Sequence, residues 1–154
     1  MYDRVKAEHE VVDYLDLLIK LRDLLRDKPE IRRFYQGLFD HIFVDEFQDT
    51  DPLQCEIVFY LCEDRGSPSP GATWDALRLA PGKLTIVGDP KQSIYRFRRA
   101  DIEAYHEAKQ HFCRQGDLLD LSLNFRSRPL VVDWVNALFS RLIQPPEDGF
   151  YQPD

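Results

Sequence analysis

Apolar residues recur along this chain at two different spacings, and each spacing predicts a different kind of element. Over residues 8–26 they recur every three or four positions, which predicts an amphipathic helix. The apolar positions of this helix are Val11, Tyr14, Leu15, Leu18, Leu21 and Leu25. A second such helix is predicted within residues 128–142, and its apolar face consists of Val131, Val135, Leu138, Phe139 and Leu142. Shorter helices are predicted over 30–38 and 101–113.

Short continuous apolar runs alternate with these helices and predict buried strands. The runs are HIFV at 41–44, KLTIVGD at 83–89 and DLLDLSLN at 117–124. Buried strands that alternate with amphipathic helices are typical of an α/β fold with a parallel sheet. Ligands of such sheets gather at the carboxyl ends of the strands, and each of the three runs ends in a polar residue or is followed directly by one.

The segment between the first two strands predicts its own helix start. Asp51 is suited to the N-cap, Pro52 to the first helical position, and Gln54 completes a capping box. Cys55 and Cys62 lie seven positions apart in this helix, so we expect them to pack on one face.

Composition narrows the class of protein. The 154 residues are 44% hydrophobic and 31% charged, which is ordinary for a globular protein. Three cysteines without metal-ligand spacing favour free thiols in a reducing compartment, and no signal-peptide pattern or membrane-length apolar run is present. We therefore expect a cytoplasmic protein without membrane association. Because the formal net charge is −7, any nucleic-acid binding requires a local basic patch.

The first candidate site follows the first strand, where HIFV runs into Asp45 and Glu46. An aspartate there can hold Mg²⁺, and a glutamate can orient or deprotonate an attacking water. Two acids that simply end a strand and face solvent are the plainer interpretation. With Asp49 and Asp51 nearby, a two-metal nuclease site is a further alternative, although Asp51 is more simply explained as a helix cap.

The second candidate site is VGDPKQSIYRFRRAD, at 87–101, which gathers positive charge beside aromatic rings. Gln92 follows the second strand closely enough to reach a nucleotide phosphate, or it is an ordinary loop residue. Tyr95 and Phe97 are two positions apart and face the same way in an extended segment. Rings interleaved with cations form a platform for unstacked bases and phosphates, unless the rings are core and the cations pair locally. The cations are Lys91, Arg96, Arg98 and Arg99.

The third candidate is NFRS, after the third predicted strand. Arg126 can neutralise phosphate charge there, and Phe125 can stack on a purine. Alone, this segment is only suggestive.

Taken together, three segments resemble motifs II, III and IV of superfamily 1A DNA helicases of the UvrD/Rep type. They are most similar to the RecB/AddA branch, whose members include exonuclease V-like proteins with a C-terminal nuclease. The segments are FDHIFVDEFQDTDPLQ, LTIVGDPKQSIYRFRRAD and LSLNFRSRPLVVDWVNALF. The resemblance implies a partial RecA-like parallel sheet flanked by helices, and an ATP-dependent helicase that translocates 3′ to 5′ on single-stranded DNA in recombination and repair. It also implies ATP and Mg²⁺ as cofactors, and its implied partners are DNA and a second helicase–nuclease subunit.

The resemblance also implies a role for each matching residue. Asp45 would bind Mg²⁺, Glu46 would be the catalytic base, and Gln92 would couple the γ-phosphate to DNA. Phe125 would lie near adenine and Arg126 on the γ-phosphate. Lys91, Tyr95, Phe97, Arg98 and Arg99 would contact single-stranded DNA, with Arg99 standing where the family usually has glycine.

The resemblance further predicts the domain organisation. Residues 1–40 would lead into the motor domain, 41–144 would form part of motor domain 1A, and 145–154 would be a linker or truncation tail. No G-x-x-x-x-G-K-[ST] motif occurs, so the P-loop strand is absent, and we expect a fragment with little or no ATPase activity of its own. A stand-alone, non-catalytic module that binds single-stranded DNA or another protein is the alternative.

Overall fold

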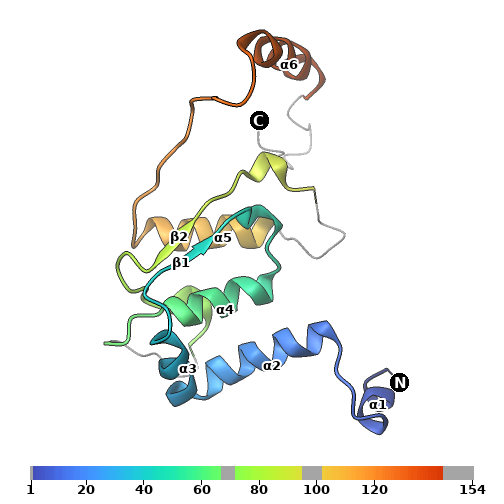
Figure 1. The fold of residues 1–154 in the computed structure, drawn as a ribbon, viewed down its shortest axis with the longest axis vertical. Coiled ribbons are helices and arrows are strands. Elements are labelled where there is room, and N and C mark those ends of the chain that lie inside the picture. Colours follow the sequence, from blue (N-terminus) through green and yellow to red (C-terminus); the bar gives the residue numbers. More distant parts are fainter. Residues whose placement is uncertain (1, 67–71, 95–101, 144–154) are drawn as a thin grey trace. The chain divides into compact units, whose positions relative to one another are not determined.

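The computed structural model describes residues 2–66, 72–94 and 102–143, and it divides the chain into two compact units, 1–117 and 118–154. Figure 1 shows the order of the elements. Within the described ranges, no helix is both long enough and apolar enough to cross a membrane. The helices are α1 (Tyr2–Glu8), α2 (Tyr14–Asp27), α3 (Pro29–Gln36), α4 (Pro52–Cys62), α5 (Ile102–Cys113) and α6 (Pro129–Leu142).

The first unit is built on a short parallel sheet. Strand β1 (Ile42–Val44) pairs with β2 (Leu84–Ile86), and Ile42 lies opposite Leu84 in the register. Helix α4 connects the two strands and contacts α2, α3 and α5 (Figure 1). The predicted α/β class, the parallel pairing and the first two strands are therefore confirmed. A parallel pair requires such a crossover, because a tight hairpin can join only antiparallel strands.

Helix α4 starts as its sequence predicts. The backbone N–H of Leu53 donates to Asp51 Oδ1 at 2.7 Å, and the N–H of Asp51 donates to Gln54 Oε1 at 3.2 Å. Cys55 and Cys62 are both buried in the core, as expected. Burial raises the pKa of each thiol to about 12.

The single helix predicted over 8–26 is wrong at its N-terminal end. Glu10 takes a left-handed backbone conformation with φ 53°, and Asp13 caps a new helix, α2. Asp13 Oδ1 accepts from the N–H of Asp16 at 2.8 Å, and Asp16 Oδ2 accepts from the N–H of Asp13 at 3.0 Å. Val11 therefore lies between helices and is 55% exposed. The apolar spacing continues across a break that local polar side chains create.

The third strand, predicted over 117–124, is also wrong, because the structure has no strand there. Leu119, Leu121 and Leu123 are exposed, and α6, which forms where predicted, buries none of its side chains. Phe43 of β1 is also 75% exposed, although β1 was expected to be buried. A strand forms only beside a hydrogen-bonding neighbour, and the described sheet has only β1 and β2.

Candidate functional site

The loop after β1 holds the two predicted acids in an unusual backbone conformation. Asp45 and Glu46 are both exposed, and Asp45 Oδ1 accepts from the N–H of Glu46 at 2.9 Å. Glu46 has φ 51° and ψ 44°, in the left-handed region that residues other than glycine seldom adopt. A short 3-10 helix, η1 (Phe47–Asp49), follows at once. Backbone strain of this kind is common at functional sites, which makes this loop a candidate site.

The loop after β2 lies against the loop after β1. The N–H of Val87 donates to Val44 O at 2.8 Å, and the N–H of Phe47 donates to Val87 O at 3.0 Å. These bonds extend the pairing beyond the strands. The carboxyl ends of β1 and β2 therefore meet at one edge of the sheet, as expected for parallel strands.

Asp89 organises the turn that carries Gln92. The turn is a short 3-10 helix, η3 (Pro90–Gln92), and the N–H of Lys91 donates to Asp89 Oδ1 at 3.0 Å. The side-chain amide of Gln92 donates to Asp89 Oδ2 at 2.9 Å. Lys91 and Gln92 are both exposed, so they are accessible to a ligand at this edge.

Gln48 connects the two loops, and the sequence reasoning missed it. Its Nε2 donates to Glu46 Oε2 at 2.7 Å, and its Oε1 accepts from the N–H of Asp89 at 2.9 Å. Only 1% of the residue is exposed. Its only distinguishing property is that a polar residue stands at a buried position. In so short a turn, the spacing of apolar residues does not reveal which positions are buried.

The remaining predicted residues lie outside the described part of the first unit. Tyr95, Phe97, Arg98 and Arg99 lie outside the described residues. Phe125 and Arg126 belong to the second unit, where the N–H groups of Arg126 and Ser127 both donate to Asn124 Oδ1 at 2.9 Å. Phe125 is 91% exposed, so its ring is available for stacking.

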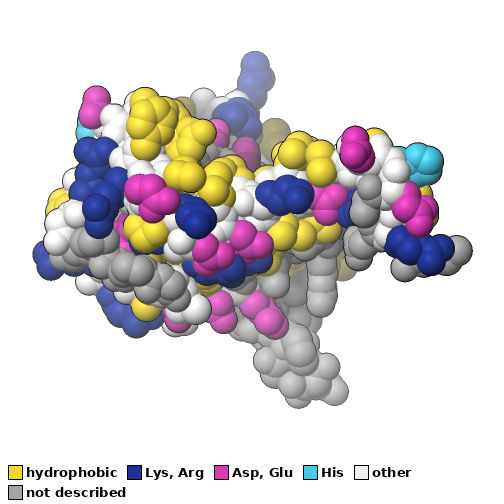
Figure 2. Space-filling view, turned by 90° about the horizontal axis from the view of Figure 1, so that it is seen from below, with side chains coloured by type: hydrophobic (Ala, Val, Ile, Leu, Met, Phe, Trp, Pro, Cys, Tyr) yellow, Lys and Arg dark blue, Asp and Glu magenta, His cyan; other side chains and the backbone are white. Residues whose placement is uncertain are grey.

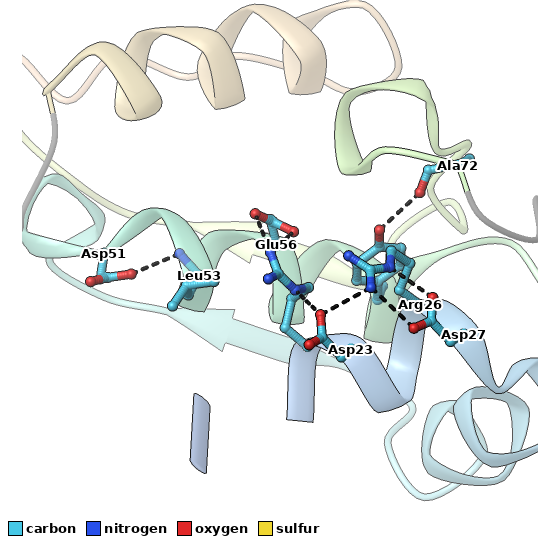
Figure 3. A network of polar contacts seen from close by, with 9 residues as sticks. Asp23, Arg26, Asp27, Asp51, Leu53, Glu56 and Ala72 are labelled. Atoms are coloured by element: carbon cyan, nitrogen blue, oxygen red, sulfur yellow. Dashed lines mark hydrogen bonds and ion pairs between the residues drawn. The ribbon is translucent and has the colours of Figure 1, made fainter. Parts of the chain in front are cut away.

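The arrangement of the acidic side chains tests the alternative of a two-metal nuclease site. Within the described parts of the chain, no three or more His, Cys, Asp or Glu side chains are grouped so that they could hold a metal ion. Asp45, Glu46, Asp49 and Asp51 therefore do not form such a group. Asp51 instead caps α4, which Figure 3 shows at the Leu53 contact.

One ion pair joins α2 to α4, the helix that follows this loop, and a second lies within α2. Nη1 of Arg22 lies 3.1 Å from both carboxylate oxygens of Glu56, and its Nε lies 2.7 Å from Asp23 Oδ1 (Figure 3). On the face shown in Figure 2, basic and acidic side chains are intermixed with apolar ones.

Comparison with known proteins decides the family. Residues 1–113 match the UvrD/REP helicase N-terminal domain. The chain belongs to the UvrD/REP helicase family. Similar proteins include an ATP-dependent helicase/nuclease of Natranaerobius thermophilus, which is 37% identical over 145 residues, covering 92% of this chain and 10% of that protein. The corresponding helicase/nuclease proteins of Staphylococcus carnosus and Bacillus pumilus are 34% and 33% identical, each over 92% of this chain and over 11% and 12% of their own lengths.

This UvrD/REP chain thus spans about a tenth of the length of the curated relatives it matches. Its residues are compatible with Mg²⁺ at the loop after β1. Mg²⁺ is usually bound by one or two carboxylates, with water and substrate phosphates completing its shell. The exposed carboxylate of Asp45, at the end of a strand, fits that description, and Glu46 beside it is held by Gln48.

Proposed function

We propose that this chain supplies part of the first motor domain of an ATP-dependent DNA helicase that acts in recombination and repair. The observation that carries the proposal is the hydrogen-bonded contact between the loops after β1 and β2. It links Glu46 through Gln48 and Asp89 to Gln92. A motor needs such a connection between the residue that acts on water and the residue that senses phosphate.

Each segment has a proposed role in that motor. The loop after β1 is motif II, where Asp45 holds Mg²⁺ and Glu46 orients and deprotonates the attacking water. The loop after β2 is motif III, where Gln92 senses the γ-phosphate. Bound Mg²⁺ supplies charge neutralisation on the transferred phosphoryl group. In motif IV, Phe125 lies near adenine and Arg126 on the γ-phosphate.

The proposed DNA platform rests on sequence. Lys91 provides a cation on the exposed side of η3, and the residues that continue from it supply rings and further cations. They are Tyr95, Phe97, Arg98 and Arg99. We infer that the complete protein contains a RecA-like sheet with its P-loop strand, moves 3′ to 5′ on single-stranded DNA, works in the cytoplasm and pairs with a second helicase–nuclease subunit. The 154-residue chain by itself is expected to hydrolyse ATP poorly or not at all.

The test is the ATPase activity of the intact protein that contains this segment, measured with Mg²⁺ and with or without single-stranded DNA. Glu46→Gln should lower kcat by about 100-fold or more while ATP still binds, because a general base contributes about 10²–10⁴-fold. Phe97→Ala should weaken single-stranded DNA binding. Unwinding of duplexes with a 3′ rather than a 5′ overhang tests the direction of movement.

Retention of full kcat by Glu46→Gln would overturn the motor proposal. A protein without ATPase activity whose DNA binding is still lost in Phe97→Ala would instead be the non-catalytic binding module. Metal-dependent cleavage of DNA that persists in Phe97→Ala and is lost in Asp45→Asn would favour the nuclease.

A further inference from the structure

Gln48 bridges the ends of both strands through its side chain and its backbone. Its side-chain Nε2 donates to Glu46 Oε2 at 2.7 Å, and its Oε1 accepts from the N–H of Asp89 at 2.9 Å. Its backbone carbonyl oxygen accepts from Ser93 Oγ at 3.2 Å. The Gln48 residue itself is 1% exposed, so its side-chain amide is held by these partners rather than by solvent, although the Glu46 carboxylate is exposed. It therefore joins residues that are about forty positions apart in the chain.

Among the unbranched side chains of this length, an amide satisfies both partners at once whereas a carboxylate or a thioether does not. The Glu46 carboxylate can only accept, and the backbone N–H of Asp89 can only donate, so the bridging group must donate at one end and accept at the other. Glutamate at position 48 would keep the acceptor but would place a second negative charge beside Glu46. Methionine has a similar length but makes neither bond. The bridge is thus a specific chemical requirement rather than a space-filling one.

The backbone is shaped to admit the amide. A Cβ on Gly88 would lie 2.9 Å from Gln48 Oε1 and 3.2 Å from the Phe47 nitrogen, which is closer than ordinary contact. Phe47 cannot move aside freely, because its N–H donates to Val87 O. Glycine at position 88 therefore lets the Gln48 amide approach the N–H of Asp89.

The bridge continues to Gln92, since Asp89 accepts from the Gln92 amide at 2.9 Å through its other end. We propose that Gln48 is a positioning residue that holds the Glu46 carboxylate and transmits to it any displacement of the η3 turn that carries Gln92. A shift of Asp89 moves the amide of Gln48, and the amide moves the carboxylate. This inference rests on the proposed function, in which Glu46 is the catalytic base.

The main experiment replaces Gln48 by methionine in the intact protein. We expect kcat for ATP hydrolysis to fall by about 10-fold or more, as for other groups that orient a catalytic residue. The KM for ATP should stay unchanged, because the Gln48 side chain contacts Glu46 and Asp89 and none of the residues proposed to bind the nucleotide. Stimulation of ATPase activity by single-stranded DNA should also fall, since the path from Gln92 to Glu46 is cut.

Gln54→Met is the matched control. Gln54 also uses its amide in the same segment, but its side chain accepts from Asp51 as the capping-box partner and takes no part in the bridge between Glu46 and Asp89. Its replacement should lower the melting temperature while kcat and stimulation by DNA stay at the parent values. Gln48→Glu is the second variant; it keeps the size of the side chain and the acceptor for Asp89, and it should also lower kcat. In Gln48→Met/Gln92→Ala, the losses of stimulation by DNA should not add, because both changes cut one path.

The outcomes separate this inference from the proposed function. A parent protein without ATPase activity, or an active Glu46→Gln, would refute the motor proposal itself. An active parent and an inactive Glu46→Gln, combined with folded Gln48→Met and Gln48→Glu variants at parent kcat and parent stimulation, would refute only the role of Gln48. A loss of melting temperature without any change in kcat would likewise show that Gln48 is purely structural.

Discussion

A buried ion pair between α3 and the end of α4 allows a quantitative test of the first unit. Arg32 Nε lies 3.2 Å from Glu63 Oε2, and both side chains are 1% exposed. The guanidinium also lies over the Tyr60 ring, 5.3 Å from its centroid. Nη1 and Nη2 of Arg32 have no hydrogen-bond partner among the described residues. Two effects on stability therefore oppose each other: the attraction between the two charges, and the cost of burying a guanidinium whose hydrogen bonds are incomplete.

The two effects nearly cancel. At 3.2 Å and an effective dielectric constant of about 20, the attraction is about 5 kcal/mol. Desolvation costs several kcal/mol for each ion, so the net contribution of the intact pair is close to zero. Removing only one partner leaves the other charge buried and should lower the free energy of unfolding by about 3–5 kcal/mol. Replacing both with apolar residues should be neutral or stabilising by about 1–4 kcal/mol.

The variants are Glu63→Gln, Arg32→Met and the double variant Arg32→Met/Glu63→Leu. Urea unfolding can be followed by the fluorescence of Trp74, which packs edge-on against Phe59 with centroids 5.2 Å apart. Trp134 is 65% exposed and belongs to the second unit, so all proteins should carry Trp134→Phe. The spectroscopic signal then reports on the first unit alone.

An exposed pair provides the control. Asp27 receives hydrogen bonds from Arg26 on the surface of α2, where the two side chains are 53% and 35% exposed. Asp27→Asn should leave the urea midpoint unchanged, because solvent screens such pairs. If Glu63→Gln unfolds at the parent midpoint, or if the double variant loses the sum of both single losses, the reasoning about the buried pair is refuted.

Three further outcomes follow from the described side chains. Asp51→Ala should lower the free energy of unfolding by about 1 kcal/mol, whereas Asp51→Asn should keep most of it, because asparagine also caps helices; urea unfolding measures both, and equal losses would contradict the cap. Only Cys113 should react quickly with a thiol reagent near pH 8, because burial raises the pKa of Cys55 and Cys62 to about 12; rapid labelling of more than one thiol in the folded protein would contradict this. Burial lowers the pKa of His111, so the unfolded state binds a proton more readily and stability should fall as the pH drops through about 6.5. Thermal unfolding should show this loss in the parent and not in His111→Gln.

Local chemistry was predictable from the sequence, whereas pairing between distant segments was predictable only in part: β1 and β2 pair in parallel as expected, but the third strand does not form. The cap of α4 by Asp51 is confirmed because it depends on residues only a few positions apart. The strand predicted over 117–124 is wrong because an apolar run becomes a strand only beside a neighbour that the described sheet lacks. The helix predicted over 8–26 is wrong at its N-terminal end because the backbone breaks at Glu10 and Asp13 caps a new helix within its apolar spacing.

The candidate site shows the same division. Asp45, Glu46 and Gln92 were predicted as candidates because each follows a strand closely, and their roles stay a prediction. Gln48 was missed because its partner Asp89 is 41 positions away, and a sequence pattern does not show which backbone groups will meet.

The left-handed backbone of Glu46 has a consequence for how this segment tolerates mutation. A residue with a Cβ costs about 1–2 kcal/mol in that conformation relative to glycine, so Glu46 is unfavourable for folding at φ 51°. A library selected only for folded protein should therefore enrich glycine or asparagine at position 46. A library selected for cell growth that depends on the proposed ATPase activity should retain glutamate there. The change in the glycine-to-glutamate ratio from one selection to the other would measure how much folding stability is lost by keeping a carboxylate at the end of β1.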